Sequence, residues 1–305
     1  LEWKEDLQSG SLCAVMGGVT AVFEMPNTEP TTTSPDMLTD KLARAKNRMH
    51  CDHAFYAGAT NENADILPEM ERMLGCCGVK VFMGASTGSL LVADDEGVER
   101  VLRAINRRAA FHSEDEYRLV ERRHLAVPGD WTSHPVVRDA EAALMSTKGL
   151  WRGLQRGIVD VIGSDHAPHT LEEKAKPYPQ SPSGMPGVQT LVPVMLDHVN
   201  AGRLTIERFV DLTSAGAQRV FGIAGKGRMA IGWDADFTLV DMKRTETITD
   251  AWSQSKSGWT PFDGMSVTGW PVGTIIRGRT VMRDGELVAP GTGQPVRFME
   301  ALQHS

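Results

Sequence analysis

The sequence predicts an α/β fold: a TIM-like (β/α)8 barrel, incomplete in the printed chain, with a small β-sandwich domain. Two observations favour this class. Short apolar runs typical of buried strands recur about every 30 residues, which is the length of a βαβ unit in a parallel sheet or barrel. Polar residues directly follow several of these runs, and barrel enzymes carry their chemistry at the carboxyl ends of the strands.

Five segments are predicted as strands, because each is short, apolar and bounded by turn-forming residues. The intervals between the first four have helical periodicity. The interval before the fifth is longer, and its strand-free sequence is predicted to form two helices. The five strands are 19–24, 51–58, 79–83, 109–112 and 158–163.

The last third of the chain changes character. Helices are predicted at 188–200 and 205–221, with Gly222 as a stop signal. Short alternating strands follow, and Asp284-Gly285 is a strong hairpin signal.

These patterns divide the chain into two domains. Residues 1–225 are predicted as the barrel, lacking its first strand, and residues 226–305 as a small β domain with a C-terminal tail. A barrel of eight units typically needs about 250 residues. We therefore expect one or two units to be missing near residues 148–149.

The composition is that of a globular protein with a small-molecule partner. Of the 305 residues, 41% are hydrophobic and 23% are charged, enough for one large core or two smaller ones. A net charge of −7, a pI near 5.7 and the lack of long Lys or Arg runs argue against nucleic acid binding. No apolar run reaches the roughly 18 residues of a membrane span, and no signal-peptide pattern is present. We expect a cytoplasmic protein with no membrane partner.

The cysteines and the first residues fit this assignment. Cys13, Cys51, Cys76 and Cys77 lie in apolar stretches without metal-ligand spacing, which favours reduced, buried thiols. The sequence opens at Leu1 inside a helix-like pattern, so we expect the natural start to precede it.

The motif G-S-D-H-A-P-H at residues 163–169 is the clearest candidate for a catalytic segment. It puts Asp165 and two histidines at the exit of a predicted buried strand, where a metal ligand or general base is useful. His169 is interpreted either as a donor to an anionic substrate or as a cap of the following helix, together with Thr170.

Further candidates lie at other strand ends. Lys80 is either an edge lysine whose amine reaches solvent or a lysine converted to a carbamate that bridges two metal ions, because an unpaired buried lysine costs free energy. His112 ends the next strand; alone it would be a hydrogen-bonded core residue, but beside Lys80 and Asp165 it is predicted to be a metal ligand. Asn27 in M-P-N-T either presents its amide to a substrate or forms an Asx turn.

These motifs resemble the dihydroorotase family, within the amidohydrolase superfamily and its allantoinase- and dihydropyrimidinase-like branch with a carboxylated lysine. The similarity covers nearly the whole chain. The D-H-A-P-H and M-P-N-T pair favours dihydroorotases over allantoinases and hydantoinases. The segments that carry the resemblance are G-G-V-T-A-V-F-E-M-P-N-T, V-K-V-F-M-G-A-S-T-G, F-H-S-E-D-E, G-S-D-H-A-P-H, S-G-M-P-G and G-W-D-A-D-F-T-L-V-D.

The resemblance implies a metal-dependent barrel, with a small β domain built from both chain ends. The implied reaction is the reversible hydrolysis of dihydroorotate to N-carbamoyl-aspartate in pyrimidine biosynthesis. It also implies two zinc ions bridged by the carbamate of Lys80, with His112 as a ligand of one ion. Asp165 would be both a zinc ligand and the acid/base that moves a proton from the attacking water to the leaving amide nitrogen.

The resemblance implies substrate-binding residues as well. Asn27 and His169 would hold the substrate's carboxylate, and the backbone around Ser183 and Gly184 would contact its ring.

The sequence departs from the family's pattern in its histidines. The family's first metal motif, two histidines one residue apart before Phe-Arg-Glu-Pro-Gly, would stand just before Leu1 and is not present. A further histidine ligand, a strand and an Asn-Pro-Pro segment would fall around residues 145–151, and these are missing too. We therefore expect a longer natural polypeptide and a spatial break near Lys148–Gly149.

Two alternative functions stay open. The missing ligands suit a non-catalytic scaffold for aspartate transcarbamoylase, although a scaffold has no evident need for residues such as Lys80 and Asp165 in working positions. The second alternative is another cyclic amidohydrolase, an allantoinase or a dihydropyrimidinase. Barrels of this family often dimerise or tetramerise, which makes a second copy of the chain a candidate partner.

Overall fold

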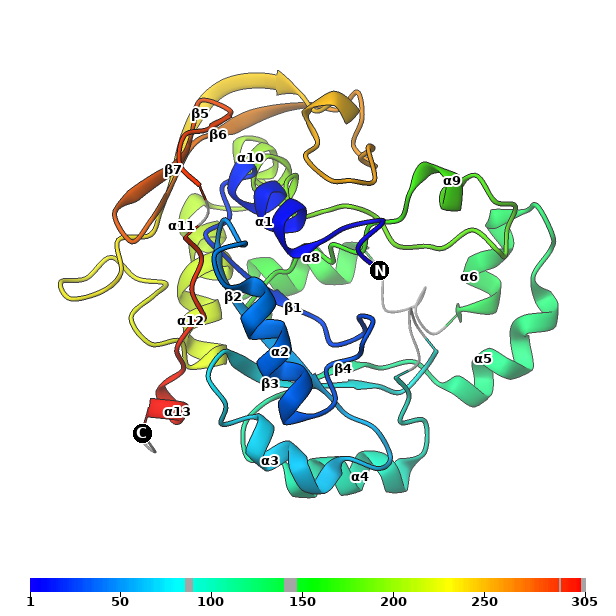
Figure 1. Cartoon of the computed structure of the whole chain (residues 1–305). Coiled ribbons are helices and arrows are strands. Elements are labelled where there is room, and N and C mark those ends of the chain that lie inside the picture. The colour runs from blue at the N-terminus through cyan, green and yellow to red at the C-terminus, as the bar shows by residue number, and fades with distance from the viewer. Residues whose placement is uncertain (86–89, 140–146, 291, 303–305) are drawn as a thin grey trace.

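The computed structural model describes residues 1–85, 90–139, 147–290 and 292–302. Figure 1 shows a parallel sheet flanked by helices and, at the top of the view, a second sheet of antiparallel strands. The strands are β1 (Ala21–Glu24), β2 (Asp52–Gly58), β3 (Cys76–Phe82), β4 (Ala109–His112), β5 (Phe237–Thr247), β6 (Ser266–Ile276), β7 (Arg279–Arg283) and β8 (Glu286–Leu287). The α-helices are α1 (Leu7–Met16), α2 (Pro35–Ala45), α3 (Leu67–Met70), α4 (Asp95–Ala104), α5 (Glu116–Arg122), α6 (His134–Val137), α8 (Thr147–Gln155), α9 (Leu171–Lys174), α10 (Leu191–Asn200), α11 (Ile206–Val210), α12 (Gly216–Phe221) and α13 (Met299–Leu302).

The parallel sheet is half of an eight-stranded barrel. Its order is β1-β2-β3-β4, so each strand pairs with the next one along the chain after a helical crossover. All seven residues of β2 and all seven of β3 are buried, as expected of parallel strands covered on both faces. The first four predicted strands are therefore confirmed.

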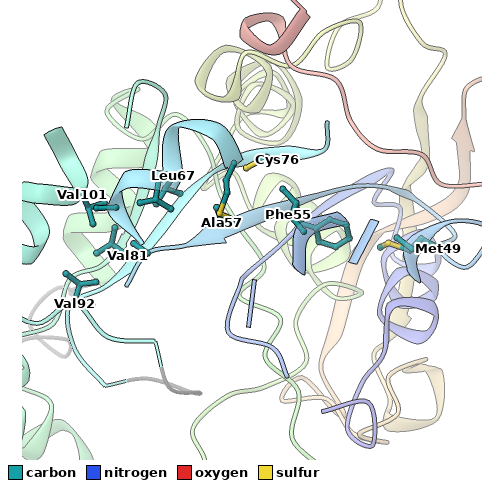
Figure 2. Close-up of a cluster of buried hydrophobic side chains, with 14 residues drawn as sticks. Met49, Phe55, Ala57, Leu67, Cys76, Val81, Val92 and Val101 are labelled. Carbon is teal, nitrogen blue, oxygen red and sulfur yellow. The ribbon is translucent and has the colours of Figure 1, made fainter. Parts of the chain in front are cut away.

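Helices cover the outer face of this sheet. Side chains from α2, α3 and α4 pack against alternate residues of β2 and β3, and Figure 2 shows part of this cluster. The members Phe55, Ala57, Val79 and Val81 lie on the strands, two residues apart, because successive side chains of a strand point to opposite faces.

The inner face carries the other half of the alternation. Tyr56 and Cys77 pack with Phe298 from the C-terminal segment. Phe23 of β1 contacts Phe221 edge to face, with ring centroids 4.9 Å apart. The candidate functional residues lie toward the end of the inner face where the strands finish.

The predicted strand at 158–163 is wrong, since these residues form no ladder with a neighbour. The segment is extended, but Ile158 is 72% exposed and the one backbone bond of Ile162 that anchors it runs to the oxygen of Leu212. An apolar run becomes a strand only when an adjacent strand satisfies its backbone groups. In the described part of the chain, no strand lies beside it.

The predicted break at Lys148–Gly149 is also not found, because α8 runs continuously through that bond. Trp151 of α8 packs edge to face on His198 of α10, with centroids 4.7 Å apart, which fixes the helix on the molecule. Residues 140–146, directly before α8, lie outside the described residues.

The antiparallel sheet confirms the β prediction for the last part of the chain. β7 and β8 pair across the two-residue loop Asp284-Gly285, and both loop residues have positive φ (50° and 84°), as a hairpin turn with the twist of the strands requires. Helix α1 packs on this sheet through Val15, whose carbonyl accepts a 2.6 Å hydrogen bond from Thr274. A helix near the start of the chain therefore packs on the sheet formed by its last third.

All four cysteines are buried and form no disulfide, which confirms the prediction of buried thiols. Burial raises the pKa of the Cys13 and Cys77 thiols well above their usual range, so they are unreactive. Among the described residues, no helix is long and apolar enough to cross a membrane.

Candidate active site

A cavity of about 1370 Å³ lies inside the half-barrel, and its lining extends from residues just before β1, such as Gly18 and Val19, to residues at the carboxyl ends of the parallel strands. Five of the seven predicted site residues line it: Asn27, Lys80, His112, Asp165 and His169. They come from the ends of β1, β3 and β4 and from the loop before α9, which are far apart in the sequence. The fold therefore brings together the residues that the strand-end argument singled out.

Lys80 and His112 share the inner face of the sheet. Lys80 and Phe82 lie two residues apart on β3, and Phe82 is the register partner of His112 on β4. The Phe82 ring lies between them, 4.9 Å from the Lys80 Nζ and 5.9 Å from the imidazole centroid. Both polar groups are thus directed into the cavity past one aromatic ring.

Lys80 is a buried amine, 8% exposed. Burial lowers the pKa of Lys80, and the charge of Asp165 opposes that shift only in part. Among the described residues, its amine has no hydrogen-bond or ion-pair partner, and it lies 4.9 Å from the centroid of the Phe82 ring. A buried amine with a lowered pKa is more often neutral and nucleophilic, which suits the carbamate predicted for it.

His112 is oriented by an acidic neighbour that sequence reasoning missed. Its Nε2 lies 3.2 Å from Glu114 Oε2, and the buried Glu114 carboxylate also pairs with Arg138. The sequence F-H-S-E places this glutamate two residues after His112, but only the fold shows that its side chain lies beside the imidazole.

Asp165 stands in a backbone conformation that is rare for a residue with a side chain, with φ of 44°. The segment that carries it is backed by the S-G-M-P-G stretch, because the amide of Ala167 donates to the carbonyl of Met185 at 2.9 Å. A Cβ on Gly184 would lie 2.3 Å from the carbonyl oxygen of Ala167, so only glycine allows this close approach.

The predicted ring-binding residues Ser183 and Gly184 do not line the cavity. Ser183 is exposed, and Gly184 packs against the loop that carries the other site residues. In this structure the segment supports the Asp165 loop, and a direct contact with substrate stays a prediction.

His169 faces the cavity with an unpaired nitrogen. Its Nδ1 lies 3.0 Å from Glu173 Oε2 and 3.4 Å from the Nζ of Lys4, while its Nε2 is buried without a hydrogen-bond partner. Burial lowers the pKa of His169, and Lys4 adds to that effect. Thr170, not His169, caps α9 through a capping box with Glu173.

A second group missed by sequence reasoning surrounds Asn27. Glu24 at the end of β1 pairs with the buried Lys41 at 3.0 Å, and Lys41 Nζ donates to Thr28 Oγ1 at 2.8 Å. Glu24, Lys41 and Thr28 line the cavity beside Asn27. Lys41 of α2 thus fixes the M-P-N-T turn through Glu24 and Thr28. No local sequence pattern predicts this contact.

The donor set fits a metal ion in chemical type but falls short in number for two ions. Of the nine histidines in the sequence, three line the cavity: His112, His166 and His169. His166 uses Nδ1 to accept two backbone amides, so it is committed elsewhere. Lys80 as a carbamate, His112 and Asp165 remain as donors, whereas a closed zinc site takes four.

The described residues contain one compact group of carboxylates: Asp52, Asp234 and Asp236. None of these three is among the residues predicted above to bind metal. Lys226 Nζ lies 2.6, 3.0 and 2.6 Å from Asp52, Asp234 and Asp236 respectively, and Arg277 pairs with the other oxygen of Asp52. A lysine ammonium already neutralises this cluster, so it serves as an internal ion-pair network.

A parallel half-barrel that carries possible metal ligands at the carboxyl ends of its strands is typical of a class of hydrolases. The amidohydrolase family model matches residues 29–281, and the chain belongs to the amidohydrolase family. This family is typically metal-dependent.

The sequence comparisons narrow this class. The chain is 32% identical to a dihydroorotase of Pyrococcus furiosus and 31% identical to one of Halobacterium salinarum; these alignments cover 96% and 97% of the chain and 80% and 85% of the relatives. It is also 29% identical to the multifunctional protein CAD of Squalus acanthias, of which it covers 15%. Among solved structures, the L-hydantoinase (dihydropyrimidinase) of Arthrobacter aurescens matches with a TM-score of 0.85 at 26% identity, over 95% of this chain and 83% of that one.

The alignment lengths bear on the missing barrel strands. The alignment with the Pyrococcus furiosus relative is 355 positions long, whereas the whole chain has 305 residues. It therefore contains at least 50 positions at which the relative has residues and this chain has none. This agrees with the expectation that one or two barrel units are missing from the chain.

Proposed function

We propose that the protein is a dihydroorotase that interconverts dihydroorotate and N-carbamoyl-aspartate in pyrimidine biosynthesis. One observation carries this proposal: Lys80, His112 and Asp165 line a single cavity at the strand ends of a chain whose dihydroorotase relatives align over nearly its full length. The hydantoinase likeness supports the fold and the class of cyclic amide hydrolases, and the dihydroorotase relatives favour the particular substrate.

Substrate binding is assigned to the cationic and amide groups at one side of the cavity. The substrate is an anion, and we assign its carboxylate to the Asn27 amide and to His169 Nε2, which donates to it when the ring is protonated at both nitrogens, since Nδ1 then donates to Glu173. Lys4, which lies 3.4 Å from His169 Nδ1, adds positive charge to the same region. Glu173 fixes the orientation of the imidazole through Nδ1.

Proton transfer is assigned to Asp165. Its carboxylate takes a proton from the attacking water and returns it to the amide nitrogen as the ring opens. Lys80 as a carbamate, His112 and Asp165 would hold metal, which we propose to be zinc, with two ions in the complete protein. When bound, a divalent ion lowers the pKa of water from about 15.7 to about 7 and polarises the carbonyl.

The test of this proposal is the cyclisation of N-carbamoyl-aspartate and the hydrolysis of dihydroorotate by the purified protein, with hydantoin, dihydrouracil and allantoin as competing substrates. Turnover of the dihydroorotate pair alone supports the proposal. Turnover of one of the other substrates instead would assign the chain to another cyclic amidohydrolase.

A scaffold function remains the second candidate, because the histidine set is incomplete. We propose that a folded, metal-free protein of 33.3 kDa with no turnover would be a non-catalytic partner of aspartate transcarbamoylase. Co-sedimentation with that enzyme tests this directly. The cytoplasmic location and a homo-oligomer stay predictions.

A further inference from the structure

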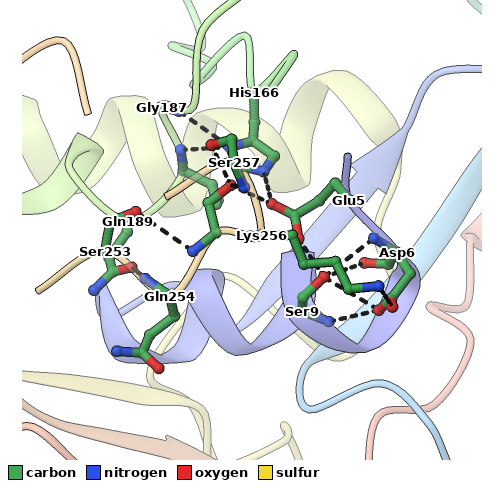
Figure 3. Close-up of polar contacts among 12 residues, drawn as sticks. Glu5, Asp6, Ser9, His166, Gly187, Gln189, Ser253, Gln254, Lys256 and Ser257 are labelled. Atoms are coloured by element: carbon green, nitrogen blue, oxygen red, sulfur yellow. Dashed lines mark hydrogen bonds and ion pairs between the residues drawn. The ribbon is translucent and has the colours of Figure 1, made fainter. Parts of the chain in front are cut away.

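We propose that Glu5 and His166 form a positioning pair that fixes Asp165 in its working conformation. This inference rests on the proposed function, since Asp165 is the acid/base of that reaction. Glu5 was not predicted as functional from the sequence, and His166 was noted only as one of the two histidines of the G-S-D-H-A-P-H motif. Figure 3 shows the contacts that carry the argument, with His166 lying between Gly187 and Glu5.

The surroundings of the His166 ring define its orientation and its proton. Its Nδ1 accepts hydrogen bonds from the backbone amides of Gly187 at 3.0 Å and Val188 at 3.3 Å. A nitrogen that faces two N–H donors has to be the unprotonated one, so the neutral ring carries its proton on Nε2. Nε2 lies 3.5 Å from Glu5 Oε2, and this contact is not a hydrogen bond, since Nε2 has no hydrogen-bond partner among the described residues.

Glu5 is itself held from two sides. Its Oε2 accepts a 2.5 Å hydrogen bond from Ser255, in the loop after β5, and its Oε1 accepts one from Ser9 of α1. Burial acts to raise the pKa of Glu5, but the nearby His166 ring and the hydrogen bonds from Ser255 and Ser9 outweigh it and lower that pKa. The carboxylate is therefore ionised and suited to accept the Nε2 proton of His166.

The pair matters because of its position in the chain. Asp165 immediately precedes His166 and has φ of 44°, a conformation that persists in a non-glycine residue only where the surroundings enforce it. His166 is anchored by the segment before α1, by the loop at 187–188 and, through Glu5, by Ser255. Releasing this anchor lets the Asp165 backbone relax away from the geometry that the reaction needs.

Kinetics of four variants test this role. We expect Glu5→Ala and His166→Phe to lower kcat by roughly 10-fold to 100-fold with little change in KM, since misplacement of a reacting group by about 1 Å has effects of that size. Glu5→Gln should recover most of the loss, because its amide oxygen can accept the Nε2 proton. His124→Asn, an exposed histidine bonded to its own helix, is the matched control and should have normal kcat.

A second measurement separates this inference from the proposed function. In ¹⁵N-histidine NMR spectra, His166 should show the Nε2–H tautomer, with a slowly exchanging proton whose signal moves or disappears in Glu5→Ala. This readout holds even if the wild-type protein does not turn over dihydroorotate. An Nδ1–H tautomer, an unchanged signal in Glu5→Ala, or a loss of kcat that merely follows a loss of folded protein in thermal melts would overturn the positioning role.

Discussion

At the scale of single residues, the chemistry follows from what burial does to ordinary side chains. Lys80 is useful because the sheet removes it from water and gives its amine no partner among the described residues. His169 is useful because it lines the cavity, with Nδ1 occupied and Nε2 buried without a hydrogen-bond partner. Both properties depend on neighbours that come from other segments of the chain.

The first prediction concerns the proposed acid/base. Asp165→Asn removes the proton-transfer group without changing side-chain size, so we expect turnover to fall by at least about 10²-fold to 10⁴-fold. The far-UV circular dichroism spectrum and the melting temperature should stay close to those of the wild type. Retained turnover in a folded Asp165→Asn protein would remove this role.

The second prediction concerns Lys80. Lys80→Met has a similar volume but cannot form a carbamate, so we expect the variant to lose bound metal and activity while remaining at least as stable as the wild type. Metal content by mass spectrometry and urea unfolding measure the two effects. Normal metal content in the variant would show that Lys80 is a structural lysine.

The third prediction concerns pH and the buried His53, which is 1% exposed. Burial lowers the pKa of His53, although Asp52 acts in the other direction. The unfolded chain, with a histidine pKa near about 6.5, therefore binds the proton more readily than the folded one. Stability should be full above that pH and should fall as the pH drops toward the lower pKa of the folded state.

Urea unfolding at about pH 8 and about pH 5.5 tests this sign, because the two values lie on either side of the unfolded-state pKa. His53→Met should lose stability less steeply between the two pH values than the wild type. His124→Asn, at an exposed site, should keep the wild-type slope. Equal slopes in all three proteins would contradict the assignment.

The residues that sequence reasoning found and missed differ in one respect. Lys80, His112 and Asp165 stand at strand ends, a position that the apolar pattern reveals before any contact is known. Glu5 and Lys41 act through contacts with residues distant in the sequence, at His166 and Glu24. Nothing local distinguishes these two from surface charges.

At the scale of elements, the first four strands were predictable because each is a buried apolar run beside a partner strand. Segment 158–163 has the same pattern but no neighbour, so pattern alone predicted a strand that the structure lacks. The glycines of S-G-M-P-G illustrate a requirement that the sequence pattern did not reveal. They allow a close backbone approach that is visible only in three dimensions. A Cβ on Gly187 would lie 2.4 Å from the carbonyl oxygen of Ser164.

The fourth prediction follows from that close approach. Gly187→Ala should push the loop away from the Asp165 segment, lowering the free energy of unfolding by about 1–3 kcal/mol and reducing kcat. Gly153→Ala in α8 is the matched control, because its nearest contact is an ordinary 3.4 Å from Val159. Equal stability and activity of the two variants would show that the loops do not depend on this contact.

At the scale of the whole molecule, an ion-pair network joins distant parts of the chain. Lys226 connects Asp52 at the start of β2 with Asp234 and Asp236, just before β5. The sequence did not predict this network, because its members lie up to 184 positions apart. The division into a barrel at 1–225 and a β domain at 226–305 stays a prediction, with Lys226 close to the proposed boundary.

The fifth prediction tests the network. Lys226→Met leaves three carboxylates close together, with Asp52 alone of them paired to the Arg277 side chain in the described residues, so we expect the free energy of unfolding to fall by about 2–4 kcal/mol in urea titrations. Lys226→Arg, which keeps the charge, should lose less. Since the ion pairs raise the pKa of Lys226 despite its burial, this stabilisation should persist at neutral pH and disappear only above the normal lysine range.

The central claim is that Lys80, His112 and Asp165 act together in one cavity as the site of a dihydroorotase. The most direct measurement is the rate at which the purified, zinc-supplemented protein forms dihydroorotate from N-carbamoyl-aspartate, compared with Asp165→Asn. We predict turnover by the wild type and none above background by the variant. A folded, metal-loaded wild type that forms no dihydroorotate would contradict the claim.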